Sequence, residues 1–160
     1  MLPAQLLVRI GIYVQTAAHL ELAVWQILMQ ARNVDEHDGV ALRKHLEIKK
    51  TTPKLIAELK DAAKDCPPNI SLRISMLAEK IEQGLENRNL VAHGAFFVEN
   101  SNENIHVAHF FPRGKGKERQ WFQIDSSITE RAAKNAIEEI DTLLREAISI
   151  RDMLTESKSS

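Results

Sequence analysis

The sequence predicts a mainly α-helical protein with a small antiparallel β-meander, at about residues 95–124, inserted before the last helix. Apolar residues recur at three- and four-residue steps through most of the chain, which is typical of amphipathic helices. Between about 95 and 124 this spacing gives way to short runs rich in aromatic and β-branched residues, which is typical of strands. Length is consistent with one compact unit, since 160 residues can bury a hydrophobic core of their own. We therefore expect a single domain over residues 1–156 and a frayed tail over 157–160.

Composition narrows the class of protein. The net charge of -1 excludes a strongly basic protein that coats nucleic acid, so any RNA contact must use a local patch. Cys66 is the only cysteine, so the chain cannot form an internal disulfide, and this fits a reducing compartment. The N-terminal segment lacks a signal-peptide pattern, and no apolar run is long enough to cross a membrane. We expect a cytoplasmic protein without a cofactor.

The N-terminal part predicts one long helix over residues 4–31, followed by a polar turn and a short helix over 40–47. Its apolar stripe is predicted to contain Ile10, Val14, Ala17, Val24 and Leu28. Glu21 falls on the same stripe. Two interpretations of Glu21 stay open: a buried acid that pairs with Arg88 or His93, or a residue at the edge of the stripe that reaches water.

Two further helices are predicted in the middle of the chain. Thr51-Thr52-Pro53 combines a hydroxyl cap with a proline suited to the first helical turn. The buried side of that helix is predicted to contain Leu55, Ile56, Leu59 and Ala62 or Ala63. Cys66-Pro67-Pro68-Asn69 ends it and opens the next helix, over about residues 70–93. The inward residues of this second helix are predicted to be Ile74, Leu77, Ala78, Ile81, Leu85 and Ala92.

The strands of the meander are predicted at residues 95–98, 105–111 and 120–124. The loop 113–119 carries one negative and four positive charges, the latter being Arg113, Lys115, Lys117 and Arg119. In one interpretation these residues bind RNA, with the aromatic residues Phe110, Phe111, Trp121 and Phe122 as stacking groups. The interpretation favoured by the sequence is a solvated hairpin tip above a small aromatic core.

The last helix is predicted to open with the capping-box pattern Ser127-Ile128-Thr129-Glu130. Its broad apolar face is predicted to contain Ala133, Ala136, Ile137, Ile140, Leu143, Leu144, Ala147 and Leu154.

No metal site is expected. Asp35-Glu36-His37-Asp38 matches neither a calcium loop nor a zinc spacing and is interpreted as a polar turn. His106 and His109 are three apart on a strand, which directs them to opposite faces. Cys66 has no histidine near it in the sequence that would activate it as a nucleophile.

The stretch Arg88-Asn89-Leu90-Val91-Ala92-His93 is the candidate functional site. At about 100° per residue, Asn89 and His93 share one face of a helix, while Arg88 and His93 flank a sector about 140° wide. Arginine offers a planar fork of donors to phosphate oxygens, histidine exchanges a proton near neutral pH, and asparagine orients a hydroxyl or a phosphate. This set can support phosphodiester transesterification without a metal. The alternative is structural, because basic residues near a helix C-terminus also favour its dipole.

These six residues resemble the Arg-polar-x3-His signature of the HEPN superfamily, with Asn89 in the polar position. The setting is similar too: the signature ends a long helix, Gly94 follows the histidine, and the N-terminal helix has the acidic residue Glu21 on its inner face. Beyond the signature, the similarity lies in the arrangement of the predicted helices, over residues 4–93 and 127–155. It implies a HEPN-like antiparallel helical bundle.

Many HEPN proteins are metal-independent endoribonucleases of toxin–antitoxin, phage-defence and RNA-processing systems, and they commonly form homodimers in which two signatures line one cleft. The resemblance implies that His93 is the general acid or base, that Arg88 binds the scissile phosphate and that Asn89 assists. Attack by the 2′-hydroxyl would leave a 2′,3′-cyclic phosphate and a 5′-hydroxyl. RNA and a cognate antitoxin or regulator are the implied partners.

Two other classes of function stay open. One is a non-catalytic HEPN-like domain that binds a nucleotide or another protein. The other is a partner-dependent regulator, such as the immunity half of a toxin pair.

Overall fold

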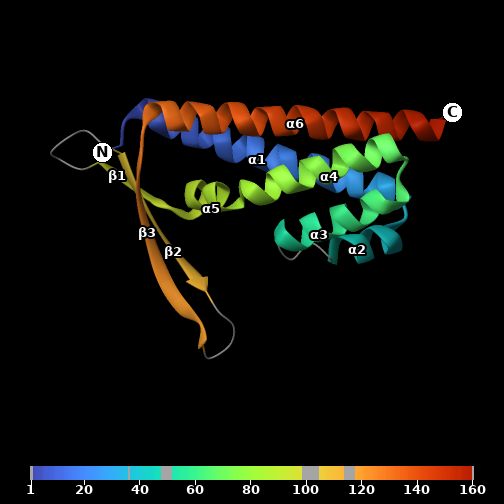
Figure 1. Cartoon of the computed structure of the whole chain (residues 1–160), viewed down its shortest axis with the longest axis horizontal. Helices are drawn as coiled ribbons and strands as arrows, with labels where there is room; N and C mark the ends of the chain where they lie inside the picture. Colours follow the sequence, from blue (N-terminus) through green and yellow to red (C-terminus); the bar gives the residue numbers. More distant parts are fainter. Residues whose placement is uncertain (1, 36, 48–51, 99–104, 114–117, 160) are drawn as a thin grey trace. The chain divides into compact units, whose positions relative to one another are not determined.

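The computed structural model describes residues 2–35, 37–47, 52–98, 105–113 and 118–159, and within them the chain is mainly helical (Figure 1). The elements follow in the order α1 (Ala4–Ala31), α2 (Gly39–Glu47), α3 (Thr52–Ala62), a 3-10 turn (Ala63–Asp65), α4 (Pro68–Gln83), α5 (Leu85–His93), β1 (Ala95–Val98), β2 (Ile105–Arg113), β3 (Gln120–Ile128) and α6 (Glu130–Ser159). The predicted fold class, mainly α with a small antiparallel β-meander before the last helix, is confirmed.

The chain forms two compact units, and α1 and α6 each contribute to both. The first unit comprises residues 1–15 and 85–139, and the second comprises 16–84 and 140–160. The single domain over residues 1–156 stays a prediction. α6 continues to Ser159, through most of the segment expected to be a frayed tail. None of the described helices has an apolar stretch of the length that crosses a membrane.

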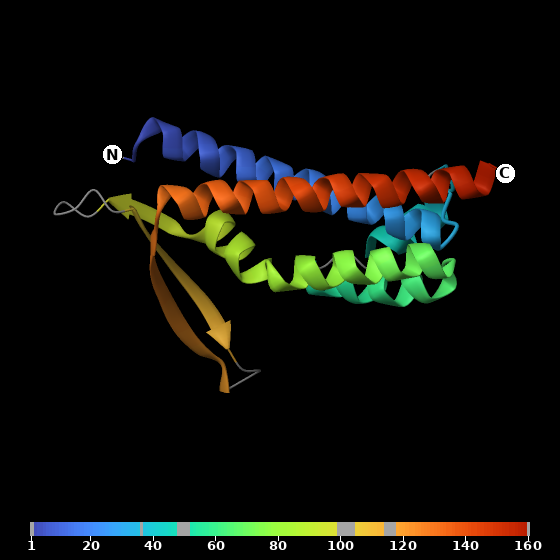
Figure 2. The same ribbon diagram turned by 45° about the horizontal axis from the view of Figure 1, so that its top comes forward.

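The second unit has a helical core. α3 and α4 pack against each other as a helix hairpin (Figure 2). The predicted buried side of α3 is confirmed, since Leu55, Ile56, Leu59, Ala62 and Ala63 are all buried. The largest fully buried side chains in this unit are Ile27, Leu28, Leu59, Ile74, Leu77 and Ile150, which come from α1, α3, α4 and α6. Burial of such side chains is the main favourable contribution to folding here.

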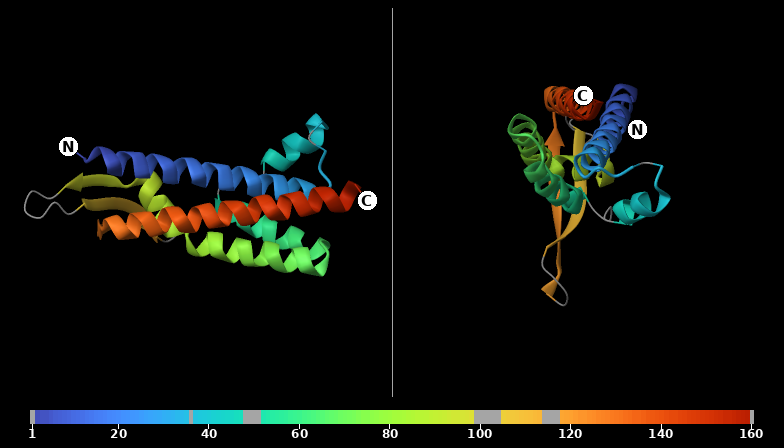
Figure 3. Two further views of the ribbon diagram at one scale, coloured as in Figure 1. Left: turned by 90° about the horizontal axis from the view of Figure 1, so that it is seen from above. Right: turned by 90° about the vertical axis from the view of Figure 1, so that its right-hand side faces the viewer.

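Polar contacts fix α6 against α4 and α1 in the second unit. Arg73 donates from Nε and Nη2 to the two carboxylate oxygens of Glu146, each at 2.8 Å. The hydrogen bond from Arg73 lowers the pKa of Glu146. The contacts to α1 are Arg151 to Gln26 at 3.1 Å and Gln30 to Thr155 at 2.8 Å. The later residue of α1 in these two pairs contacts the later residue of α6, so α1 and α6 run parallel in this unit (Figure 3).

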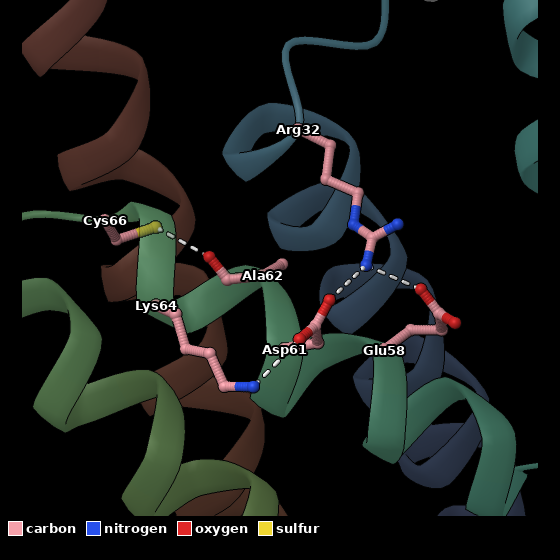
Figure 4. A network of polar contacts seen from close by, with 6 residues as sticks. All are labelled: Arg32, Glu58, Asp61, Ala62, Lys64 and Cys66. Atoms are coloured by element: carbon pink, nitrogen blue, oxygen red, sulfur yellow. Dashed lines mark hydrogen bonds and ion pairs between the residues drawn. The ribbon is translucent and has the colours of Figure 1, made fainter.

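A charged network joins the end of α1 to α3 (Figure 4). Arg32 Nη2 lies 2.6 Å from a carboxylate oxygen of Glu58 and 3.3 Å from one of Asp61. Lys64 donates to the other Asp61 oxygen at 3.0 Å, and this hydrogen bond is the main cause that lowers the pKa of Asp61. The thiol of Cys66 donates to a backbone carbonyl of the preceding turn at 3.6 Å. This contact ties the thiol to the end of α3.

The polar turn before α2 is confirmed by its hydrogen bonds. Asp38 Oδ1 accepts the backbone N–H groups of Val40 and Ala41 at 3.0 and 3.1 Å and so caps α2. Asp35 Oδ1 accepts the N–H of His37 at 2.9 Å. Glu36 and Thr51 lie outside the described residues. α3 begins at Thr52, so Pro53 is its second residue and not, as the cap-proline pattern predicts, its first.

The predicted stripe of α1 needs correction. Val14 is 42% exposed, whereas Tyr13, one residue earlier, is buried at 8%. The buried positions of the stripe are Leu6, Tyr13, Ala17, Leu20, Val24 and Ile27, which also follow helical spacing. Glu21 is half-buried beside this stripe. It belongs to the second unit and Arg88 and His93 to the first, so their pairing stays a prediction.

The predicted helix over 70–93 is wrong as one helix, because it is divided at Gly84. The N–H of Gly84 donates to Lys80 O at 3.1 Å and closes the last turn of α4, with φ -83° and ψ -4°. Glycine is about 1 kcal/mol less favourable than alanine inside a helix, so ending the helix at this residue costs little free energy. Ala92, expected to point inward, is exposed on α5.

The three strands form a sheet in the order β1-β2-β3, and both pairs are antiparallel. β3 is longer than predicted and ends at Ile128. Ser127 is therefore in the strand, where it pairs with His106. The predicted capping box is wrong for this reason: Thr129 caps α6 instead, and its Oγ1 accepts the N–H of Ala132 at 3.1 Å.

The two faces of the sheet differ. Val107 of β2 is fully buried on the face that packs against α5, and His109 lies on that same face. The opposite face carries Phe110 and Trp121, which are 60% and 65% exposed. The small aromatic core favoured by the sequence is therefore wrong for these two residues.

Candidate functional site

The candidate site lies on α5, in the first unit. At about 100° per residue, Asn89 falls between Arg88 and His93, whereas Leu90 and Val91 fall on the opposite side of the helix. Asn89 and His93 are exposed, and Arg88 is half-buried. The three predicted site residues therefore share one sector of α5, while Leu90 and Val91 face the interior of the unit.

Arg88 lies at the border of this sector, near a buried tyrosine of α1. Burial raises the pKa of Tyr13, the charge of Arg88 lowers it in part, and the charge of Glu139 raises it. Two charges of opposite sign therefore act on the Tyr13 hydroxyl, that of Arg88 from α5 and that of Glu139 from α6.

His93, the last residue of α5, stacks on a second histidine. The rings of His93 and His109 have centroids 6.2 Å apart and planes inclined by 27°. From its position in the sequence, His109 is expected only to point to the opposite face of the strand from His106. No spacing rule links the two residues, because only the packing of α5 on β2 brings them together.

Gly94 makes this packing possible. A β-carbon at this position would overlap the carbonyl oxygen of Leu90 and a methyl group of Val107. The N–H of Gly94 also donates to that carbonyl at 2.8 Å. Its φ lies outside the left-handed region. The glycine expected at the helix end is therefore required by the close approach of α5 to β2.

A pocket of about 260 Å³ lies beside α5, on the side away from the exposed sector. Leu90 and Val91 form one wall, and the other walls come from α1, α6, β1 and β3. The lining is largely apolar, with Tyr13 and Ser126 among its polar residues. All lining residues belong to the first unit. Such a pocket can bind an apolar ligand with a small polar group.

The remaining predicted binding residues are distributed along the β2–β3 hairpin. The guanidinium of Arg119 lies 5.3 Å above the ring of Trp121. Arg113 ends β2, but its side chain is outside the described residues, and so are Lys115 and Lys117. In the described part of the chain, no three histidine, cysteine or acidic side chains gather as a metal site.

Comparisons with known proteins add no assignment to the site. Family models, curated proteins and solved structures give no match to the chain. The functional interpretation therefore rests on the residues of this molecule.

The titration of Tyr13 tests the surroundings of Arg88. Tyr13 is the only tyrosine, so tyrosinate absorbance reports it alone. We expect the folded protein to titrate above the ordinary value of 10.0, and Arg88→Gln to raise the pKa further, because a charge that lowers it is lost.

A raised pKa makes a stability contribution that is fully present below about pH 10 and is lost as pH rises through the folded pKa. Chemical denaturation of wild type should show this loss, and Tyr13→Phe should remove it. Titration of folded and unfolded protein at the same pH would contradict the burial of Tyr13.

Substitution of Gly94 tests the contact between α5 and β2. Gly94→Ala should lower the free energy of unfolding by about 1–3 kcal/mol, because backbone and core atoms must move. The matched control is Gly11→Ala, where an added β-carbon meets nothing within 4 Å. It should stabilise α1 by about 0.5–1 kcal/mol. Urea denaturation measures both, and equal effects would show that no close contact exists at Gly94.

Proposed function

We propose that this protein is a metal-independent endoribonuclease of the HEPN type, which acts as a homodimer through Arg88, Asn89 and His93. The observation that carries the proposal is the shared sector of α5, in which helical spacing places Asn89 between Arg88 and His93. We infer the type of reaction from the resemblance of these residues to the HEPN signature.

The reaction is an intramolecular transesterification of RNA. The 2′-hydroxyl gives its proton to a base, and its oxygen forms a bond to the adjacent phosphorus. The bond from phosphorus to the 5′-oxygen breaks, and that oxygen takes a proton from an acid. Arg88 stabilises the charge on the non-bridging oxygens, Asn89 orients the phosphate, and His93 carries one of the two protons.

His109 positions His93 in this proposal. The stacked ring restricts the orientation of the His93 imidazole, which is otherwise exposed at the end of a helix. Base and acid must act on opposite sides of the phosphorus, and two stacked rings lie on one side of it. His109 therefore does not replace the second proton carrier.

A second copy of the chain supplies that carrier. Pairing two α5 helices about a two-fold axis provides two guanidinium and two imidazole groups, so that one His93 acts as base and the other as acid. A composite site of this kind makes activity depend on dimer formation.

The biological role proposed with this activity is that of a toxin or phage-defence effector in the cytoplasm. A cognate antitoxin or regulator would hold an unspecific ribonuclease inactive in its own cell. This part of the proposal rests on the resemblance alone.

Cleavage assays test the nuclease proposal. Wild type should cleave RNA in the presence of EDTA and leave 2′,3′-cyclic phosphate and 5′-hydroxyl ends. His93→Ala and Arg88→Ala should each lower the rate at least about 100-fold, because each removes a group that acts in the transition state. The specific rate of wild type should rise with protein concentration as the dimer forms.

The control is His37→Ala, which removes an exposed histidine outside the site and should cleave as wild type. His109→Phe, which keeps an aromatic ring against His93, should retain more activity than His109→Ala and leave the shape of the pH–rate profile unchanged. The proposal fails if folded wild type leaves RNA intact or if His93→Ala cleaves equally well.

The pocket beside α5 favours a second candidate function. Its largely apolar lining, formed in part by Leu90 and Val91 of the signature, fits a non-catalytic ligand-binding domain. In that function the signature serves to place Leu90 and Val91 in the pocket wall.

Dye binding tests the pocket. Anilinonaphthalene sulfonate, an apolar anion, should bind folded wild type with a stoichiometry of about one. Ala136→Phe should abolish binding by filling the pocket, whereas Asn135→Phe, on the exposed side of the same turn, should not. Dye binding that is equal in both variants would show that the dye sits elsewhere. Dye binding without RNA cleavage by wild type would favour the ligand-binding function.

A further inference from the structure

The sheet has an open aromatic face, which we define by Phe97, Phe110 and Trp121. Residues paired across antiparallel strands point to the same side of a sheet. Phe97 pairs with His106, and Phe110 lies four residues further along β2, so both point to the same side of the sheet. Trp121 pairs with Pro112, two residues beyond Phe110, and points to that side too. The three rings are 42%, 60% and 65% exposed. One face therefore presents an aromatic ring from each strand.

This exposure is unusual for side chains of this kind. Large aromatic rings bury 150–250 Å² each when they are packed, so leaving three exposed sacrifices a sizeable hydrophobic contribution. The opposite face of the same strands buries Val107 completely. Sheet formation alone therefore does not explain why large aromatic residues occupy these exposed positions.

Positive charge lies next to the rings. The guanidinium of Arg119 stacks over Trp121 at 5.3 Å, a cation–π contact that holds a cation beside an aromatic platform. The guanidinium of Arg119 is complementary to phosphate.

Polar side chains separate the rings. Gln123 pairs with Phe110, Asp125 pairs with Ala108, and both lie on the open aromatic face. Asp125 approaches His106 at 3.7 Å, and His106 stacks on Phe97 with centroids 5.6 Å apart. Phe110 lies four residue steps along β2 from His106, the partner of Phe97, which is about 13 Å at about 3.3 Å per residue. The face thus offers three aromatic rings with hydrogen-bonding groups among them.

We propose that the open aromatic face binds single-stranded nucleic acid. Bases stack on Trp121, Phe110 and Phe97, and phosphates lie near Arg119. At base edges the Gln123 amide donates or accepts hydrogen bonds, and the Asp125 carboxylate accepts them. The polar residues between the rings favour this occupant over a second copy of the chain, since the core of a dimer interface is more apolar and poorer in charge. The proposal stands apart from catalysis on α5, because it requires neither Arg88 nor His93.

Fluorescence and anisotropy with a single-stranded 2′-O-methyl oligoribonucleotide test the proposal. This probe resists cleavage by 2′-hydroxyl attack, so binding is measured without catalysis. Trp121 and the buried Trp25 are the only tryptophans, and the oligonucleotide should quench the exposed one. Trp121→Ala and Phe110→Ala should each weaken binding about 10-fold or more. Arg119→Gln should weaken it and lower the slope of log affinity against log salt by about one.

The matched control is Phe122→Ala. Phe122 is 39% exposed and adjacent to Trp121, but it points to the other face of β3, so its loss should leave affinity unchanged in a variant that remains folded. His93→Ala should also bind as wild type, even if it abolishes cleavage.

Three results would overturn the proposal. The first is the absence of binding by folded wild type. The second is an equal loss in Phe122→Ala and Trp121→Ala. The third is sedimentation that shows a dimer dissociated by Trp121→Ala without any oligonucleotide binding, which would identify a second copy as the occupant. Loss of cleavage with intact binding would count against the nuclease alone.

Discussion

The close approach of α5 to β2 at Gly94 is the constraint on which the first unit depends. With no side chain at this position, the backbone at the end of α5 lies against the core residue Val107. The chain then passes directly from α5 into β1, the first strand of the sheet. The same approach brings the ring of His93 onto that of His109. The absence of a side chain at Gly94 thus allows both the contact of α5 with β2 and the stacking of His93 on His109.

This arrangement separates two kinds of chemistry. The face of the sheet that packs on α5 contributes His109 beside the groups that can transfer protons and hold a phosphate. The open aromatic face contributes rings and a cation, which can hold bases without reacting with them. If both proposals hold, the sheet links binding of a single strand to cleavage by the helix that covers its other face.

The basic residues of the chain serve different purposes. Arg73 and Arg32 make short ion pairs that join helices within the second unit. Such partly exposed pairs contribute modestly to stability, about 1 kcal/mol or less each. Arg88 instead borders an exposed sector with Asn89 and His93, near a buried tyrosine. The difference between these arginines lies in their surroundings, since all three carry the same guanidinium group.

The sequence by itself determined the elements whose cause is local. Apolar periodicity predicted α1 and the buried side of α3, and turn chemistry predicted the polar turn before α2. Short runs rich in aromatic and β-branched residues predicted the three strands. These patterns act within a few residues of one another, so they can be read without the fold. The placement of Arg88, Asn89 and His93 on one helical sector followed from the same periodicity.

Tertiary structure decided what depends on contacts between distant residues. The partner of His93, the burial of Tyr13 in place of Val14 and the exposure of Phe110 and Trp121 each depend on which surface packs against which. The break at Gly84 and the extension of β3 through Ser127 also differ from the local pattern. Pairing of Ser127 with His106 in the sheet prevailed over a capping box that its sequence allowed, because propensities of a fraction of a kcal/mol yield to strand pairing and packing.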